Sequence, residues 1–110
     1  MANVKFFIDA ALMREKDAAL DGLLAQTRAL LCARLDIPEA ACQFVAIGVR
    51  SLADQPAVNI EISLLPKPDR TAEKLRSLCE DARDIATRIL SAHTAVRCAQ
   101  LDAATYIAIK

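Results

Sequence analysis

Apolar side chains recur with two different spacings, one after the other, along the first half of the chain. In residues 4–8 apolar side chains alternate with a mixed set, which predicts a β-strand with one buried face. In residues 17–35 apolar side chains recur at intervals of three and four, which predicts a long amphipathic helix. Pro38 ends this helix, because the residue before a proline avoids helical backbone angles. Residues 42–50 are apolar on both faces, so we expect a second strand in the centre of its sheet.

The second half of the chain repeats this order. Residues 58–64 alternate apolar and polar side chains and predict a third strand with one solvent-exposed face. Thr71 is a candidate N-cap for a second helix. Residues 95–101 predict a fourth strand, and the apolar tail at 105–109 is a candidate for a further short one. The expected core stripe of the second helix consists of Leu75, Leu78, Ala82, Ile85 and Ile89.

This order of elements predicts one domain over residues 1–110. A strand, a crossover helix and a parallel strand form a right-handed unit, so two such units in one sheet place both helices on the same face. The expected fold class is therefore α+β, with a four-stranded mixed sheet and two helices on one face. Phe7, Phe44 and the apolar tail would otherwise meet water on the opposite face. We therefore expect the chain to form an oligomer.

Composition and charge exclude several classes of function. The chain has 14 Lys and Arg against 14 Asp and Glu, so it offers no basic field for nucleic acid or an anionic membrane. No apolar run approaches the ~20 residues that cross a bilayer. The first residues do not read as a secretory signal, so we expect a cytoplasmic protein. The hydrophobic share of 55% is high for 110 residues, which again favours contact with other subunits.

The four cysteines are not spaced as metal ligands. They include no C-x-x-C pair, and His93 is the only histidine. We expect Cys32, Cys79 and Cys98 to be small buried hydrophobic residues. No glycine-rich phosphate loop occurs, and no metal or other cofactor is expected.

Three blocks of the sequence resemble the tautomerase superfamily. Within it, the length and the passage from the third strand to the second helix are most similar to the 5-carboxymethyl-2-hydroxymuconate isomerase group, and less so to the macrophage migration inhibitory factor group. The resemblance implies a homotrimer with active sites between subunits. It also implies a catalytic base at the amino terminus that moves a proton between carbon atoms of an enol or keto acid, while arginines hold the carboxylate. The blocks are residues 4–8, residues 35–38 leading into 44–47, and residues 58–62 leading through 69–74 into the second helix.

The resemblance places the catalytic base at Ala2, where the family has a proline exposed by removal of the initiator methionine. A free α-amino group titrates near pH ~8 and can act as a general base after a modest shift. While Met1 is retained, however, the Ala2 nitrogen is an amide with no basic lone pair. A start of Met-Ala-Asn is one from which the initiator is normally trimmed, so the role of Ala2 depends on removal of Met1.

Other candidates each have a second reading. Arg50 ends the second strand, near where the family tends to place a substrate-binding arginine, but it also fits a solvated strand end. Arg14 could supply a second grip on a carboxylate, or belong to a solvated charge cluster. Tyr106 could donate a proton, or pack its ring and leave its hydroxyl in water. Lys5, close to the chain start, could stand in as a base if its ammonium is buried, but an edge-strand lysine is commoner. His93 fits a helix end, where histidine is favoured for reasons unrelated to catalysis.

These observations favour a trimeric tautomerase-like isomerase of small unsaturated keto or hydroxy carboxylic acids. The alternative is a non-catalytic oligomeric module that binds a small ligand or a protein. A nucleic-acid-binding ferredoxin-like domain is poorly supported, because its sheet would need exposed aromatic and basic residues.

Overall fold

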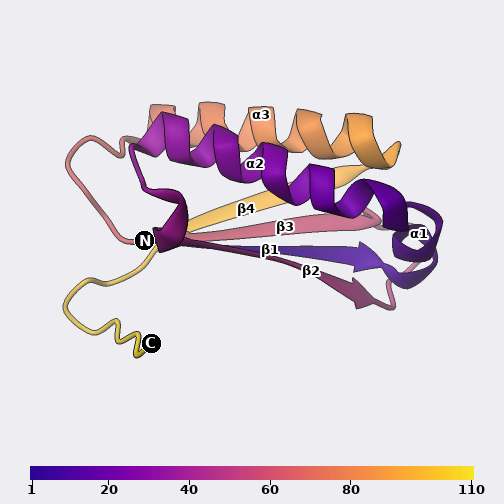
Figure 1. Ribbon diagram of the computed structural model, residues 1–110, viewed down its shortest axis with the longest axis horizontal. Helices are drawn as coiled ribbons and strands as arrows, with labels where there is room; N and C mark the ends of the chain where they lie inside the picture. Colours follow the sequence, from indigo (N-terminus) through magenta and orange to yellow (C-terminus); the bar gives the residue numbers. More distant parts are fainter.

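Residues 1–110, described by a computed structural model, form one four-stranded sheet with helices on one face (Figure 1). The predicted fold class, α+β with a four-stranded mixed sheet and helices on one face, is confirmed. Short 3₁₀ turns occupy Asp17–Ala19 and Glu39–Ala41. The elements are β1 (Ala2–Asp9), α1 (Ala10–Glu15), α2 (Leu20–Leu35), β2 (Cys42–Val49), β3 (Val58–Leu64), α3 (Ala72–Leu90) and β4 (Thr94–Gln100).

The strands lie in the order β2-β1-β3-β4. β1 pairs parallel to β2 and antiparallel to β3, and β3 pairs parallel to β4. The prediction that residues 42–50 form a central strand is wrong, because β2 lies at the edge of the sheet. The prediction of an edge strand around Lys5 is also wrong, since β1 is central. Lys5 is accommodated there because it lies on the open face of the sheet, opposite Glu61 of β3.

The core lies between the sheet and the two long helices. Phe6 of β1 is fully buried, and its ring centroid lies 6.5 Å from that of Phe44 on β2. Phe44 is the register partner of Val4, so it faces the helices, and the expectation that it lies on the open face is wrong. Phe7 lies on the open face, in register with Ile47, which is 36% exposed. The uncovered side therefore carries apolar groups next to polar ones.

The helices differ from the predictions at their ends. Helix α1 was not expected, and α2 begins at Leu20 rather than at residue 17. Asp9 caps α1 by accepting a hydrogen bond from the backbone nitrogen of Ala11 at 3.2 Å. The predicted cap of α3 agrees with the structure, where Thr71 Oγ1 accepts from the backbone nitrogen of Lys74 at 3.2 Å.

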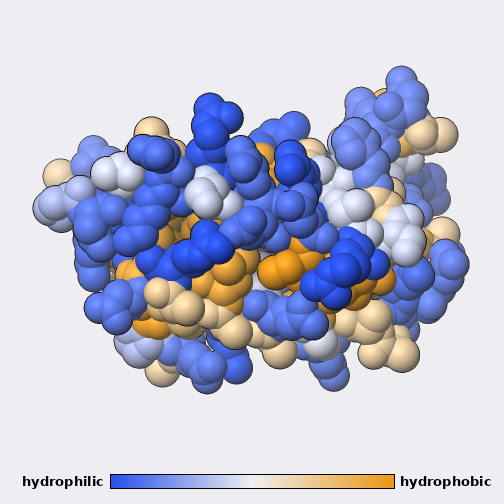
Figure 2. All heavy atoms as spheres, turned by 90° about the horizontal axis from the view of Figure 1, so that it is seen from above, coloured by the Kyte–Doolittle hydropathy of each residue, from blue (hydrophilic) through white to orange (hydrophobic).

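The buried stripe of α3 turns slightly further round the helix than predicted. Ala86 and Leu90 are fully buried, whereas Ile85 and Ile89 lie half-buried beside them. The outer side of the helical layer is mostly hydrophilic, with hydrophobic groups visible in the middle (Figure 2). Neither α2 nor α3 is long and apolar enough to span a membrane.

Residues 101–110 form no strand, so the further strand suggested by the apolar tail is absent. The tail leaves β4 and loops below the sheet, at the end where the chain also begins (Figure 1). Ile107 and Ile109 are 79% and 92% exposed. The two ends of the chain therefore approach each other at one edge of the molecule.

Candidate functional site at the chain start

A cavity of about 410 Å³ lies between the start of β1, the start of β2 and the C-terminal tail. Both strands begin at this end of the sheet because they are parallel, with Ala2 in register with Cys42. The C-terminal tail lines the other side of the cavity. The lining residues are mostly apolar and include Met1, Ala2, Cys42, Tyr106, Ile107 and Ile109.

The α-amino group of Met1 lies at this cavity and has an altered basicity. Partial burial lowers its pKa from the ordinary value of 8.0, and the positive charges of Arg70 and Lys67 lower it further. The neutral amine is the form that can accept a proton. A lowered pKa therefore increases the share of amine that can act as a base near neutral pH.

Arg70 is buried to 3% exposure in the loop before α3. One guanidinium nitrogen, Nη1, donates to the carbonyl oxygen of Leu65, while Nε and Nη2 have no hydrogen-bond partner. A buried guanidinium with unpaired donors is costly, and a carboxylate would satisfy two of them in parallel. Arg70 is not among the cavity-lining residues, but its charge acts on the Met1 amine.

Ala2 and Tyr106 are brought together by the fold. Ala2 is 1% exposed and sits between Cys42 of β2 and Leu64 of β3 in the sheet register. The Tyr106 hydroxyl lies 3.8 Å from the Met1 sulfur and lines the same cavity. Because Met1 precedes it, the Ala2 nitrogen is a backbone amide in this structure, and the basic amine belongs to Met1.

Arg14 and Arg50 lie at the opposite end of the sheet within one chain. Val49, next to Arg50, pairs with Asp9, the last residue of β1, and Arg14 is in α1. Since β1 has 8 residues, about 25 Å separates its two ends. One chain therefore does not bring Arg14 or Arg50 to Ala2, and their predicted role requires a second copy of the chain.

A larger groove of about 1000 Å³ runs between α3 and β4. It is lined by His93, Cys79 and Cys98, among others. Cys32, Cys79 and Cys98 are half-buried, whereas they were predicted to be buried. The sulfur atoms of Cys32 and Cys42 lie 3.4 Å apart. No group of three or more His, Cys, Asp or Glu side chains is arranged to hold a metal ion.

No protein-family model and no curated protein matches the sequence. Solved structures match it over nearly its whole length. A macrophage migration inhibitory factor-like protein from Entamoeba histolytica has a TM-score of 0.72 at 9% identity, covering 98% of this chain and 95% of its own. A malonate semialdehyde decarboxylase has a TM-score of 0.68 at 12% identity, covering 97% and 90%. A fused 4-OT, described as an asymmetric trimer, has a TM-score of 0.67 at 13% identity, covering 90% and 85%.

The chain therefore has the tautomerase-superfamily fold. Of the predicted site residues, Ala2 and Tyr106 lie at one cavity in the structure. Arg70, in the block 69–74 of the resemblance, was not predicted to be a site residue. No local pattern distinguishes Arg70 from other arginines beside a helix cap, because its burial arises from the loop that connects β3 to α3.

Proposed function

We propose that this protein is a tautomerase-like isomerase of small unsaturated keto or hydroxy carboxylic acids, with its site at the chain start. The observation that carries the proposal is the α-amino group of lowered pKa under the influence of Arg70, a buried arginine with two unpaired nitrogen atoms. A base and a cation close together are what proton transfer on a carboxylic acid requires. The tautomerase fold is consistent with this chemistry.

In the proposed reaction the neutral amine removes a proton from the enol or from a carbon next to the carbonyl group. It then returns the proton to another atom of the same conjugated system. Arg70, which lies outside the cavity lining, stabilises the substrate carboxylate through its positive charge, and the Tyr106 hydroxyl, which lines the cavity, donates a proton. The amine belongs to Met1 when the initiator is retained, and to Ala2 when it is removed.

We further propose a homotrimer. One similar structure is described as an asymmetric trimer, and the open face of the sheet carries Phe7 and Ile47. In such an assembly a neighbouring subunit would supply Arg14 or Arg50 to the cavity. The finer prediction of an activity like that of 5-carboxymethyl-2-hydroxymuconate isomerase rests on the sequence resemblance and defines the first substrates to test.

The direct test is enol-to-keto conversion of phenylpyruvate and of a 2-hydroxymuconate. Three preparations are compared: protein with Met1, protein from which an aminopeptidase has removed Met1, and protein whose terminal amine has been acetylated. We expect conversion above the buffer rate in at least one of the first two and none in the acetylated control. Buffer-level rates in all three would contradict the enzymatic proposal.

The second candidate function is a non-catalytic binding module. It is favoured by the amide state of the Ala2 nitrogen while Met1 is present, which leaves the cavity without the base at the position that the resemblance implies. A thermal-shift screen of small carboxylates separates the two functions. Stabilisation of the protein by a ligand that it does not turn over, in all three preparations, would favour the binding module.

A further inference from the structure

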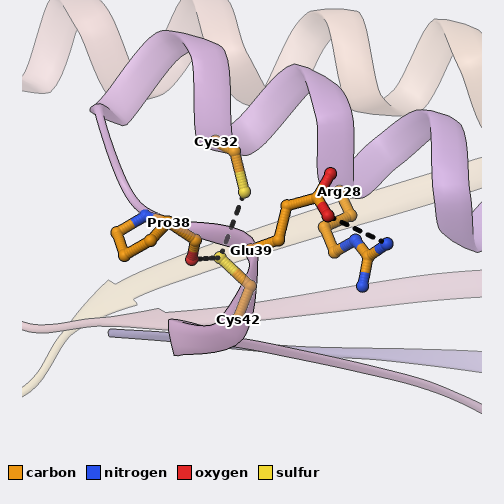
Figure 3. Close-up of polar contacts among 5 residues, drawn as sticks. All are labelled: Arg28, Cys32, Pro38, Glu39 and Cys42. Carbon is orange, nitrogen blue, oxygen red and sulfur yellow. Dashed lines mark hydrogen bonds and ion pairs between the residues drawn. The ribbon is translucent and has the colours of Figure 1, made fainter.

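Two cysteines meet at the junction between α2 and β2. Cys32 lies in the last part of α2 and Cys42 is the first residue of β2. Their sulfur atoms are 3.4 Å apart, and Cys42 Sγ also lies 3.7 Å from the carbonyl oxygen of Pro38 (Figure 3). Both side chains are half-buried. The contact is therefore short, and small oxidants have partial access to it.

We propose that Cys32 and Cys42 form a redox-active dithiol that a hydroperoxide converts to an intramolecular disulfide. A disulfide has a sulfur separation of about 2.0 Å, so the two sulfur atoms, 3.4 Å apart, have to approach each other by roughly 1.4 Å. In the connecting turn, Glu39 forms an ion pair with Arg28 of α2 at 3.5 Å (Figure 3).

The order of the two steps follows from the surroundings of Cys42. Burial raises the pKa of this thiol to about 11, so its thiolate is scarce at neutral pH. The Cys32 thiolate therefore attacks one peroxide oxygen, the O–O bond breaks, and a sulfenic acid forms while the released hydroxide takes a proton to become water. The Cys42 thiol then attacks the Cys32 sulfur, loses its proton, and displaces the second oxygen as water. Two thiols are oxidised and one hydroperoxide is reduced.

The proposed disulfide is independent of the proposed isomerase activity. It would join the end of α2 to the start of β2 and enclose the short turn Glu39–Ala41. Cys42, together with Ala40 and Ala41, also lines the cavity at the chain start. Oxidation would therefore fix one wall of that cavity, whatever the cavity binds.

The test treats the whole protein with increasing hydrogen peroxide, blocks the remaining thiols, and maps peptides without reduction. We expect a peptide pair linked through Cys32 and Cys42 in monomeric chains, reversed by dithiothreitol. We also expect a Tm higher by roughly 5–10 °C than in the reduced protein. In Cys42→Ser, a dimedone adduct should accumulate on Cys32, since the second thiol is absent. In Cys32→Ser, Cys42 should remain reduced at the same peroxide dose.

Three results would overturn the proposal. The first is a wild-type map without the linked pair at doses that label Cys32 in Cys42→Ser. The second is equal dimedone labelling of Cys32 in the wild type and in Cys42→Ser. The third is a link formed only between chains, which a non-reducing gel detects. The wild-type map alone decides the matter if either serine variant fails to fold.

Discussion

The two strand-helix-strand units share one topology but differ in their reactive groups. Each unit has a cysteine pair between its helix and its outer strand. In the first, Cys42 lies 3.4 Å from Cys32, and burial raises its pKa to about 11. In the second, a hydrogen bond with Cys98 lowers the pKa of Cys79 to about 7. Each unit thus has cysteines on its helix and on its outer strand, at different positions along these elements, and local burial and pairing decide the chemistry of each pair.

The units also differ in the cavities that they contain. The first contains the chain start, where the Met1 amine, the charge of Arg70 and a cavity of about 410 Å³ come together. The second has a wider groove of about 1000 Å³ along α3 and β4, which contains no chain terminus. A terminal amine can therefore act as a base only in the first unit, although the groove of the second is larger.

Substitutions in the core test whether the two units unfold cooperatively, and we expect them to change stability most. Phe6 in the first unit and Ile60 in the second are fully buried and packed in the same cluster. We expect Phe6→Ala to lower the free energy of unfolding by about 3–5 kcal/mol and Ile60→Ala by about 2–5 kcal/mol, each with a single transition. Urea unfolding at a fixed protein concentration measures this. Lys5→Ala, on the exposed face of the same strand as Phe6, should change it by less than ~0.5 kcal/mol. Two separate transitions in either core variant would show that the units unfold independently.

The second prediction concerns the difference in thiol reactivity between the two cysteine pairs. At pH 7 we expect Cys79 to react with iodoacetamide about 100-fold faster than Cys42, because far more of it is thiolate. The Cys79 rate should fall as the pH drops below about 7, where the thiolate becomes protonated. The Cys42 rate should keep rising towards pH 11. Mass spectrometry of labelled peptides follows both sites, and equal rates at pH 7 would contradict the contrast.

The third prediction concerns Arg70. Arg70→Met removes the charge and keeps much of the volume, so we expect phenylpyruvate to bind about 10-fold or more weakly. The pKa of the α-amino group should rise, because a nearby positive charge has been removed. Arg76→Met on the exposed side of α3 is the matched control from the second unit. Calorimetric titration measures the affinities, and equal binding by both variants and the wild type would exclude Arg70 from the site.

The smallest expected effect compares how the two long helices begin. Thr71→Ala removes the side-chain cap of α3 and should lower the free energy of unfolding by about 1 kcal/mol. Residue 19 precedes α2 with φ −94° and ψ −9°, which is helical rather than cap geometry. Ala19→Ser should therefore change stability by less than ~0.5 kcal/mol. A clear gain from Ala19→Ser in thermal unfolding would show that α2 can adopt a capped start.

The sequence predicted the fold better than the site. The spacing of apolar side chains and the positions of prolines and turn residues predicted β1 to β4 and the cap at Thr71, because these signals are local. The order of the strands could not be predicted from these signals. The apolar character of residues 42–50 is equally compatible with an edge strand whose outer face is half-exposed. The burial of Arg70 and the contact between Cys32 and Cys42 arise from loop geometry, which has no periodic signal. Ala2 was indicated by the resemblance alone.

The most direct test of the account is a titration of the α-amino group in the folded wild-type protein. The rate of its acylation by an amine-selective reagent, measured by peptide mapping across pH, gives the pKa. We predict a midpoint below 8.0, as expected for a partly buried amine influenced by Arg70 and Lys67. A midpoint at or above 8.0 would contradict the claim that the chain start is prepared to act as a base.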